Sequence, residues 1–95
     1  MIRVFLVDDQ TLVRQGVRSL LELADGIEVV AEASDGKQAV EQIPLVKPDV
    51  VLMDMRMPVM SGLDALQALS KANALPPTII LTTFDDDQLV LAGIK

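Results

Sequence analysis

The sequence contains no cysteine and no histidine, and its only aromatic residues are two phenylalanines. Without cysteine, disulfide bonds and thiolate metal sites are excluded. Without histidine, the chain lacks the commonest general base, the commonest ligand of transition metals, and the serine and cysteine catalytic triads. The side chains that remain for chemistry are carboxylates, hydroxyls and a few amines.

Positive charge is also scarce, since eight basic residues face fourteen acidic ones and the formal net charge is -6. Such a chain has neither the basic surface that binds phosphate backbones nor the aromatic platforms on which single-stranded bases stack. We therefore expect this segment to bind no nucleic acid.

Long apolar runs are missing as well. The opening Met1–Val7 is too short for the core of a signal peptide and runs directly into Asp8 and Asp9. No stretch approaches the roughly 20 apolar residues of a membrane span. We expect a soluble, cytoplasmic chain with no membrane partner.

What the sequence does contain is an alternation of apolar strands with short amphipathic helices. Hydrophobic residues make up 51% of the 95 positions, which is enough for the core of one domain over residues 1–95. The expected strands are 2–7, 27–33, 50–54 and 78–83, and the expected helices are 10–24, 37–43, 62–71 and one from residue 85 onward. This order of four strand–helix units predicts an α/β fold with a doubly wound parallel sheet.

The helices carry three specific expectations. Gly16 interrupts the apolar stripe of the first helix at a cost of about 1 kcal/mol, so we expect the helix to approach the sheet closely there. Pro44 is expected to end the second helix at Ile43. In the third helix, the expected buried residues are Leu63, Leu66 and Leu69.

The third expected strand organises the chain. Its apolar run Val50–Met53 reads as a strand buried on both faces, and it ends on Asp54. Binding crevices of open α/β sheets lie at the carboxyl ends of the strands, so Asp54 is expected at the mouth of a site. The alternative is that Asp54 is a turn carboxylate or a cap for the following helix.

Asp8 and Asp9 follow the first strand in the same way. In the doubly wound order 2-1-3-4-5 the first and third strands are neighbours, so both residues are expected to meet Asp54. Three carboxylates in one crevice repel one another unless a cation neutralises them, and an oxygen-only ligand set favours Mg²⁺. The alternative for the pair is that it caps the first helix.

A magnesium site of this kind would allow phosphoryl chemistry. One carboxylate could act as a nucleophile towards phosphorus while the others hold the metal on the phosphoryl oxygens. Thr82, at the end of the fourth strand, is positioned to donate its hydroxyl to such a group. Its alternative role is that of an ordinary β-branched strand residue.

These residues together resemble the receiver domain of two-component response regulators, which has a flavodoxin-like fold. The resemblance covers the whole chain and rests on Asp8-Asp9, Asp54, Met57-Pro58, Gly62 and Thr82. The segment Leu81–Asp87 is similar to the subgroup whose full-length members end in a LuxR-type helix-turn-helix domain.

The resemblance implies a role for each site residue. Asp54 would be the phosphoacceptor for a sensor histidine kinase, and Thr82 would be the switch hydroxyl. Asp9, Asp54 and the backbone carbonyl of Arg56 would ligate Mg²⁺, with Asp8 assisting through water. The domain would be no enzyme beyond its own phosphoryl transfer and hydrolysis, and DNA would be bound only by a separate output domain.

One departure from the family accompanies this match. Family members carry a fifth strand and helix, with a strand-borne lysine and an aromatic switch residue, whereas this sequence stops at Lys95. We therefore expect a C-terminally incomplete receiver whose fourth strand leaves Ile79, Ile80 and Leu81 at a sheet edge. Such an edge predicts a homodimer or a strand-exchanged oligomer.

Other functions fit less well. A haloacid dehalogenase-type phosphatase would need a second Asp where Arg56 stands, and Asp8-Asp9-Gln10 would repel the phosphate of a flavin. The alternative that stays open is a receiver-like interaction module that works without phosphorylation, since the family's strand-borne lysine is absent.

Overall fold

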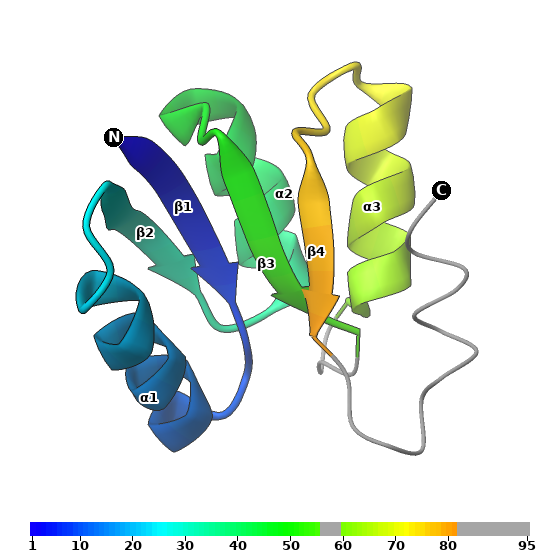
Figure 1. Cartoon of the computed structure of the whole chain (residues 1–95). Helices are drawn as coiled ribbons and strands as arrows, with labels where there is room; N and C mark the ends of the chain where they lie inside the picture. Colours follow the sequence, from blue (N-terminus) through cyan, green and yellow to red (C-terminus); the bar gives the residue numbers. More distant parts are fainter. Residues whose placement is uncertain (56–59, 82–95) are drawn as a thin grey trace.

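The computed structural model describes residues 1–55 and 60–81, and strands alternate with helices along them (Figure 1). The elements are β1 (Ile2–Val7), α1 (Thr11–Glu22), β2 (Ile27–Ala33), α2 (Gly36–Val46), β3 (Val50–Asp54), α3 (Gly62–Lys71) and β4 (Thr78–Leu81). The expected fourth helix, Thr82 and Arg56 lie outside the described residues. No helix in the described ranges has the length and apolar character that a bilayer crossing needs.

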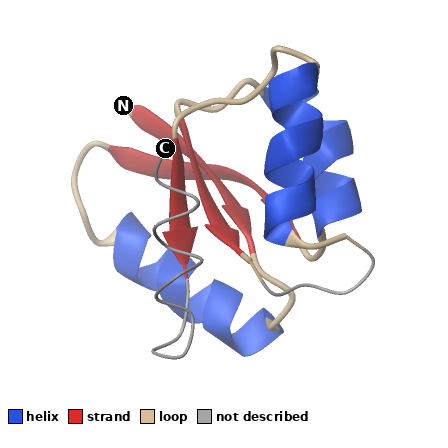
Figure 2. Cartoon of the chain, turned by 90° about the vertical axis from the view of Figure 1, so that its right-hand side faces the viewer, coloured by secondary structure: helices blue, strands red, loops and turns tan. Residues whose placement is uncertain are grey.

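The strands form one parallel sheet in the order β2-β1-β3-β4. Helix α1 covers one face of this sheet, and α2 and α3 cover the other (Figure 2). The expected doubly wound parallel sheet is therefore confirmed, and so is the 2-1-3-4 part of the expected strand order. With β1 and β3 side by side in the middle, the loops that follow them open at the same edge.

Alternate residues of β1 supply the two halves of the core. Phe5 and Val7 face α2 and α3, whereas Val4 and Leu6 face α1 together with Leu52 of β3. Because the side chains of a strand alternate between its faces, a strand covered on both sides must be apolar at every position. Val4–Val7 of β1 and Val51–Met53 of β3 are accordingly buried, and each run is followed directly by an aspartate, Asp8 or Asp54.

Helices α2 and α3 each begin at a side chain that caps the first turn. The Asp35 carboxylate accepts a hydrogen bond from the backbone N–H of Gln38 at 2.8 Å, and the Ser61 hydroxyl accepts one from that of Asp64 at 3.2 Å. Both are N-caps, as expected for turns that precede helices.

Three helix expectations were wrong. Helix α2 runs through Pro44 to Val46, because a proline in the last turn removes one backbone hydrogen bond without blocking the few residues that follow. Leu63 is 37% exposed, because the buried stripe of α3 runs through Gly62, Ala65, Leu66 and Leu69 and leaves Leu63 beside it. An added Cβ at Gly16 would meet nothing within 4 Å, so no close approach explains this glycine.

Candidate metal centre

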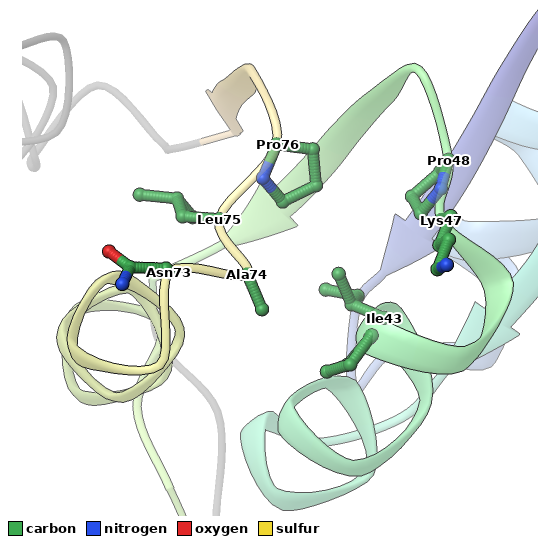
Figure 3. A pocket seen from close by; sticks show the side chains of 8 residues that line it. Ile43, Lys47, Pro48, Asn73, Ala74, Leu75 and Pro76 are labelled. Atoms are coloured by element: carbon green, nitrogen blue, oxygen red, sulfur yellow. The ribbon is translucent and has the colours of Figure 1, made fainter.

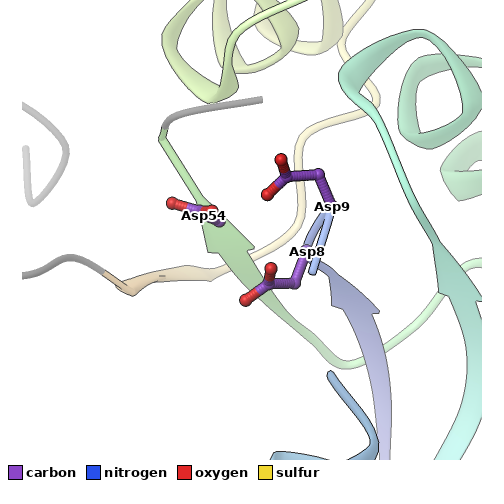
Figure 4. A group of neighbouring side chains, drawn as sticks. All are labelled: Asp8, Asp9 and Asp54. Atoms are coloured by element: carbon purple, nitrogen blue, oxygen red, sulfur yellow. The ribbon is translucent and has the colours of Figure 1, made fainter. Parts of the chain in front are cut away.

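Asp8, Asp9 and Asp54 lie together at the carboxyl edge of the sheet (Figure 4). Each offers a carboxylate oxygen, and the three oxygens lie within 4.8 Å of one another. Two neighbouring strands bring them together, because Val7 of β1 is in register with Met53 of β3 and the acidic residues follow. This arrangement matches the convergence expected from the strand order.

Asp8 is anchored at three points. Its side chain is buried, its backbone N–H donates to the Ala33 carbonyl oxygen at 3.1 Å, and its Oδ1 accepts from the N–H of Gln10 at 2.8 Å. Its own carbonyl oxygen accepts a hydrogen bond from Nη1 of Arg14 at 2.7 Å. The N-cap of α1 is Gln10, which makes no side-chain capping bond, so the acidic pair does not serve as the cap of this helix.

Asp9 has a buried carboxylate oxygen whose surroundings bear on whether a cation fits. Its Oδ1 is buried and has no hydrogen-bond partner among the described residues. A buried carboxylate oxygen without a donor is costly, and two further carboxylates nearby add repulsion. A hard divalent cation such as Mg²⁺ satisfies oxygen ligands of this type, so the residues present fit a magnesium ion.

Asp54 is the last residue of β3 and is partly buried. Its strand position pairs with Leu81 of β4, the residue that precedes Thr82 in the sequence. Arg56 and Thr82 themselves lie outside the described residues. The roles of phosphoacceptor for Asp54, switch hydroxyl for Thr82 and magnesium ligand for the Arg56 carbonyl stay predictions, and so do the roles in magnesium binding given to Asp8 and Asp9.

Two glycines bring helices α2 and α3 against the backbone of Asp54, Met55 and Met60. A Cβ on Gly62 would lie 2.5 Å from the carbonyl oxygen of Asp54, and the Gly62 N–H donates to the Met55 carbonyl at 3.0 Å. The N–H of Gly36 in α2 donates to the Met60 carbonyl at 3.2 Å, and a Cβ there would overlap the same oxygen. Only glycine allows such close backbone approach, so Gly62 packs against Asp54 and Met55 and Gly36 packs against Met60.

A group of ion pairs beside the acidic edge was not anticipated from the sequence. Arg14 Nε pairs with Glu32 Oε1 of β2 at 2.9 Å, and Arg18 also pairs with Glu32 and, at 2.7 Å, with Glu22. The hydrogen bond from Arg18 to Glu22, and then that to Glu32, raises the pKa of the Arg18 guanidinium. The sequence offered one signal for these ion pairs. Arg14 and Arg18 are spaced by about one helical turn, so they lie on the same side of the helix, and the second expected strand carries Glu32 among its polar residues.

A separate pocket lies at the opposite end of the sheet (Figure 3). It has a volume of about 360 Å³ and is lined by residues that end α2 and precede β3 and β4, among them Ile43, Lys47, Pro48 and Pro76. None of the described residues that line it carries a carboxylate, and it lies at the other end of the strands from Asp8, Asp9 and Asp54.

Comparisons with known proteins agree with this geometry. The family model of the response regulator receiver domain matches residues 4–95, and the chain therefore belongs to this family. The chain is 48% identical over 92 residues to the nitrate/nitrite response regulator protein NarP of Escherichia coli (strain K12), covering 97% of this chain and 43% of NarP.

A solved structure agrees at the level of the fold. The DNA-binding response regulator of the LuxR family from Staphylococcus aureus superposes with a TM-score of 0.87 at 29% identity, covering 99% of this chain and 78% of that one. The expected flavodoxin-like receiver fold and the similarity to LuxR-type regulators are thus confirmed.

Receiver domains of this family also occur beside enzymes. A protein-glutamate methylesterase/protein-glutamine glutaminase of Methanococcoides burtonii is 46% identical over 76 residues, which cover 80% of this chain and 22% of that protein. The chain thus spans less than half the length of the curated relatives it matches. Membership of the family identifies the receiver domain, but it does not identify the activity that the receiver controls, since the relatives include both a response regulator and a methylesterase.

Proposed function

We propose that residues 1–95 form one receiver unit in which Asp54 accepts a phosphoryl group from a phosphohistidine of a sensor histidine kinase. The observation that carries this proposal is the convergence of Asp8, Asp9 and Asp54 in a chain of the receiver family, where a buried Oδ1 of Asp9 has no donor among the described residues. A crevice with this charge suits phosphoryl transfer only when a cation is present.

Mg²⁺ is the cation we propose, held by Asp9, Asp54 and the backbone carbonyl of Arg56. When bound, it would neutralise the negative charge of the phosphoryl oxygens. Asp8 is proposed to act through water, in keeping with the hydrogen bond that its Oδ1 accepts from Gln10.

The transfer itself is a displacement at phosphorus. An oxygen of the Asp54 carboxylate forms a bond to phosphorus while the bond between phosphorus and the histidine nitrogen breaks, and the released imidazole takes up a proton. Water later hydrolyses the acyl phosphate and regenerates the carboxylate. We expect no catalysis on any separate substrate by this domain.

Thr82 is the proposed sensor of the phosphoryl group. Its hydroxyl would donate to a phosphoryl oxygen and shift an existing equilibrium of the segment that follows β4. In the cytoplasm this shift would reach a DNA-binding output domain in a longer protein, either directly or through a homodimer or strand-exchanged oligomer. Ile79 supports an association through β4, because 55% of it is exposed on the outer strand of the described sheet.

Intact-mass measurement tests the proposal. The chain is incubated with Mg²⁺ and a small phosphoryl donor beside Asp54→Asn, with and without chelator. We expect one phosphoryl adduct on the wild type that disappears with chelator and in Asp54→Asn. Asp64→Asn, which changes an exposed aspartate of α3, is the matched control and should still be phosphorylated. The absence of any adduct would favour the interaction module that needs no phosphorylation.

A further inference from the structure

The Asp8 carbonyl oxygen is held by a side chain from the next helix. Arg14 lies in the first turns of α1, and its Nη1 donates to this oxygen at 2.7 Å. The peptide group concerned is the one that joins Asp8 to Asp9. A hydrogen bond to its oxygen therefore restrains the orientation of this peptide group, and with it the directions in which the Asp8 and Asp9 side chains leave the backbone.

Arg14 is itself oriented by β2. Its Nε donates to Oε1 of Glu32 at 2.9 Å, so one guanidinium bridges the second strand and the acidic turn. The side chains are 16% and 24% exposed, which makes this pair better shielded than an ordinary surface ion pair. A planar guanidinium suits this bridge, because it holds several donors in one rigid plane.

The remaining anchors of the turn involve backbone donors. The Asp8 N–H donates to Ala33, and the Gln10 N–H donates to the Asp8 carboxylate. Arg14 is thus the part of this arrangement that a side-chain substitution removes without touching any of the three carboxylates.

We propose that Arg14, oriented by Glu32, is a positioning residue that holds the Asp8–Asp9 peptide in the conformation needed to bind a divalent cation. This inference rests on the proposed function, because it concerns the same magnesium site. Residues that orient metal ligands through hydrogen bonds commonly change metal affinity 10-fold to 100-fold when they are replaced.

Electrostatics alone makes the opposite prediction. A guanidinium near a cation site repels the cation, so removing its charge should tighten binding if charge were all that mattered. A positioning role requires weaker binding when Arg14 is replaced. The sign of the change in affinity therefore separates the two explanations.

The experiment is a calorimetric titration of the 95-residue chain with Mg²⁺, for wild type, Arg14→Gln and Arg14→Lys. We expect about 10-fold weaker binding for Arg14→Gln. Arg14→Lys should also weaken binding, because lysine keeps the charge and cannot make both contacts. Arg18→Gln and Arg18→Lys are the matched controls. Arg18 lies on the same helix as Arg14 and also pairs with Glu32, but no bond joins it to Asp8 in the described structure. Its substitution should therefore leave the Mg²⁺ affinity within about twofold of the wild-type value.

Amide NMR spectra of the metal-free proteins supply a readout that does not depend on magnesium. Arg14→Lys should shift the amides of Asp9 and Gln10, whereas Arg18→Lys should leave them in place. Wild-type affinity or tighter binding in both Arg14 variants would overturn the inference while the proposed function stands. If Arg14→Gln fails to fold, Arg14→Lys decides alone. A wild-type chain that binds no Mg²⁺ would overturn both proposals.

Discussion

Val7 and Met53 are partners in the parallel register of β1 and β3, and the acidic centre follows from this pairing. Asp8 comes after Val7 and Asp54 comes after Met53, so two segments far apart in the sequence end at the same point in space. Both aspartates follow buried apolar runs, Val4–Val7 and Val51–Met53, so they appear where the central strands leave the core. The sheet thereby concentrates negative charge at one edge.

Replacement of Asp9 by asparagine should change the stability of the metal-free chain and its affinity for Mg²⁺ in opposite directions. We expect Asp9→Asn to raise the free energy of unfolding by about 1 kcal/mol in chelator. The neutral amide removes the repulsion between carboxylates, and it replaces a buried charged group, one oxygen of which has no donor among the described residues. Binding of Mg²⁺ should weaken at least about 10-fold. Urea denaturation and calorimetric titration measure the two effects.

The control for this variant is Asp64→Asn, which removes the same charge from the exposed first turn of α3. We expect it to keep wild-type Mg²⁺ affinity and to lose about 0.5 kcal/mol or less. A metal-free Asp9→Asn that is less stable than the wild type would contradict the assignment of a costly unpaired carboxylate.

Alanine at two glycines should have opposite effects. Gly62→Ala should destabilise the chain by about 2 kcal/mol, because the new Cβ would lie 2.5 Å from the Asp54 carbonyl oxygen. Gly16→Ala should stabilise it by about 1 kcal/mol, because a Cβ there meets nothing and alanine favours the helix. Urea denaturation of both variants tests the pair, and equal effects would show that the packing at Gly62 is unimportant.

The role proposed for Thr82 predicts a split between phosphorylation and its consequence. Thr82→Ala should still accept a phosphoryl group on Asp54, since the nucleophile and the metal ligands are untouched. It should lose the change in amide chemical shifts that phosphorylation produces in residues 83–94 of the wild type. Intact mass and NMR spectra of the same samples decide this, and Thr83→Ala is the neighbouring control. A full spectral change in Thr82→Ala would exclude the hydroxyl as the sensor.

Association through β4 predicts a concentration-dependent mass. At tens of micromolar the wild-type chain should sediment as a dimer or larger assembly, because β4 is the outer strand of the described sheet and Ile79 is 55% exposed on it. Ile79→Lys should shift it towards monomer. Leu45→Lys, at an 82% exposed position on α2, should not. A monomeric wild type would rule out this mode of association.

Much of the architecture followed from local patterns. The bounds expected for Ile2–Val7, Ile27–Ala33 and Gly62–Lys71 agree with β1, β2 and α3. These elements have unambiguous periodicity, and turn or cap residues stand at their ends. The convergence of the carboxylates also followed, because strand order and the carboxyl-edge rule need no side-chain detail.

Four features of the structure did not follow from the local patterns. Pro44 did not stop α2 at Ile43, and Leu63 stayed partly exposed although its spacing matched the apolar stripe. Gly16 faces open space, so the usual reason for a glycine in a helix does not apply to it. The bridge from Glu32 through Arg14 to Asp8 was not foreseen, since charged residues on a helix most often form a solvated face.

The sequence by itself determined the alternation of strands and helices, the parallel sheet and the edge at which its acidic residues gather. These depend on periodicity and on the burial of apolar runs, which are written into neighbouring residues. Only the tertiary structure decided three features: Asp9 has an oxygen without a donor among the described residues, a Cβ on Gly62 would overlap the Asp54 carbonyl oxygen, and Arg14 donates to the carbonyl of Asp8. Each of these is a contact between groups brought together by packing, and its distance is set by how the helices sit on the sheet.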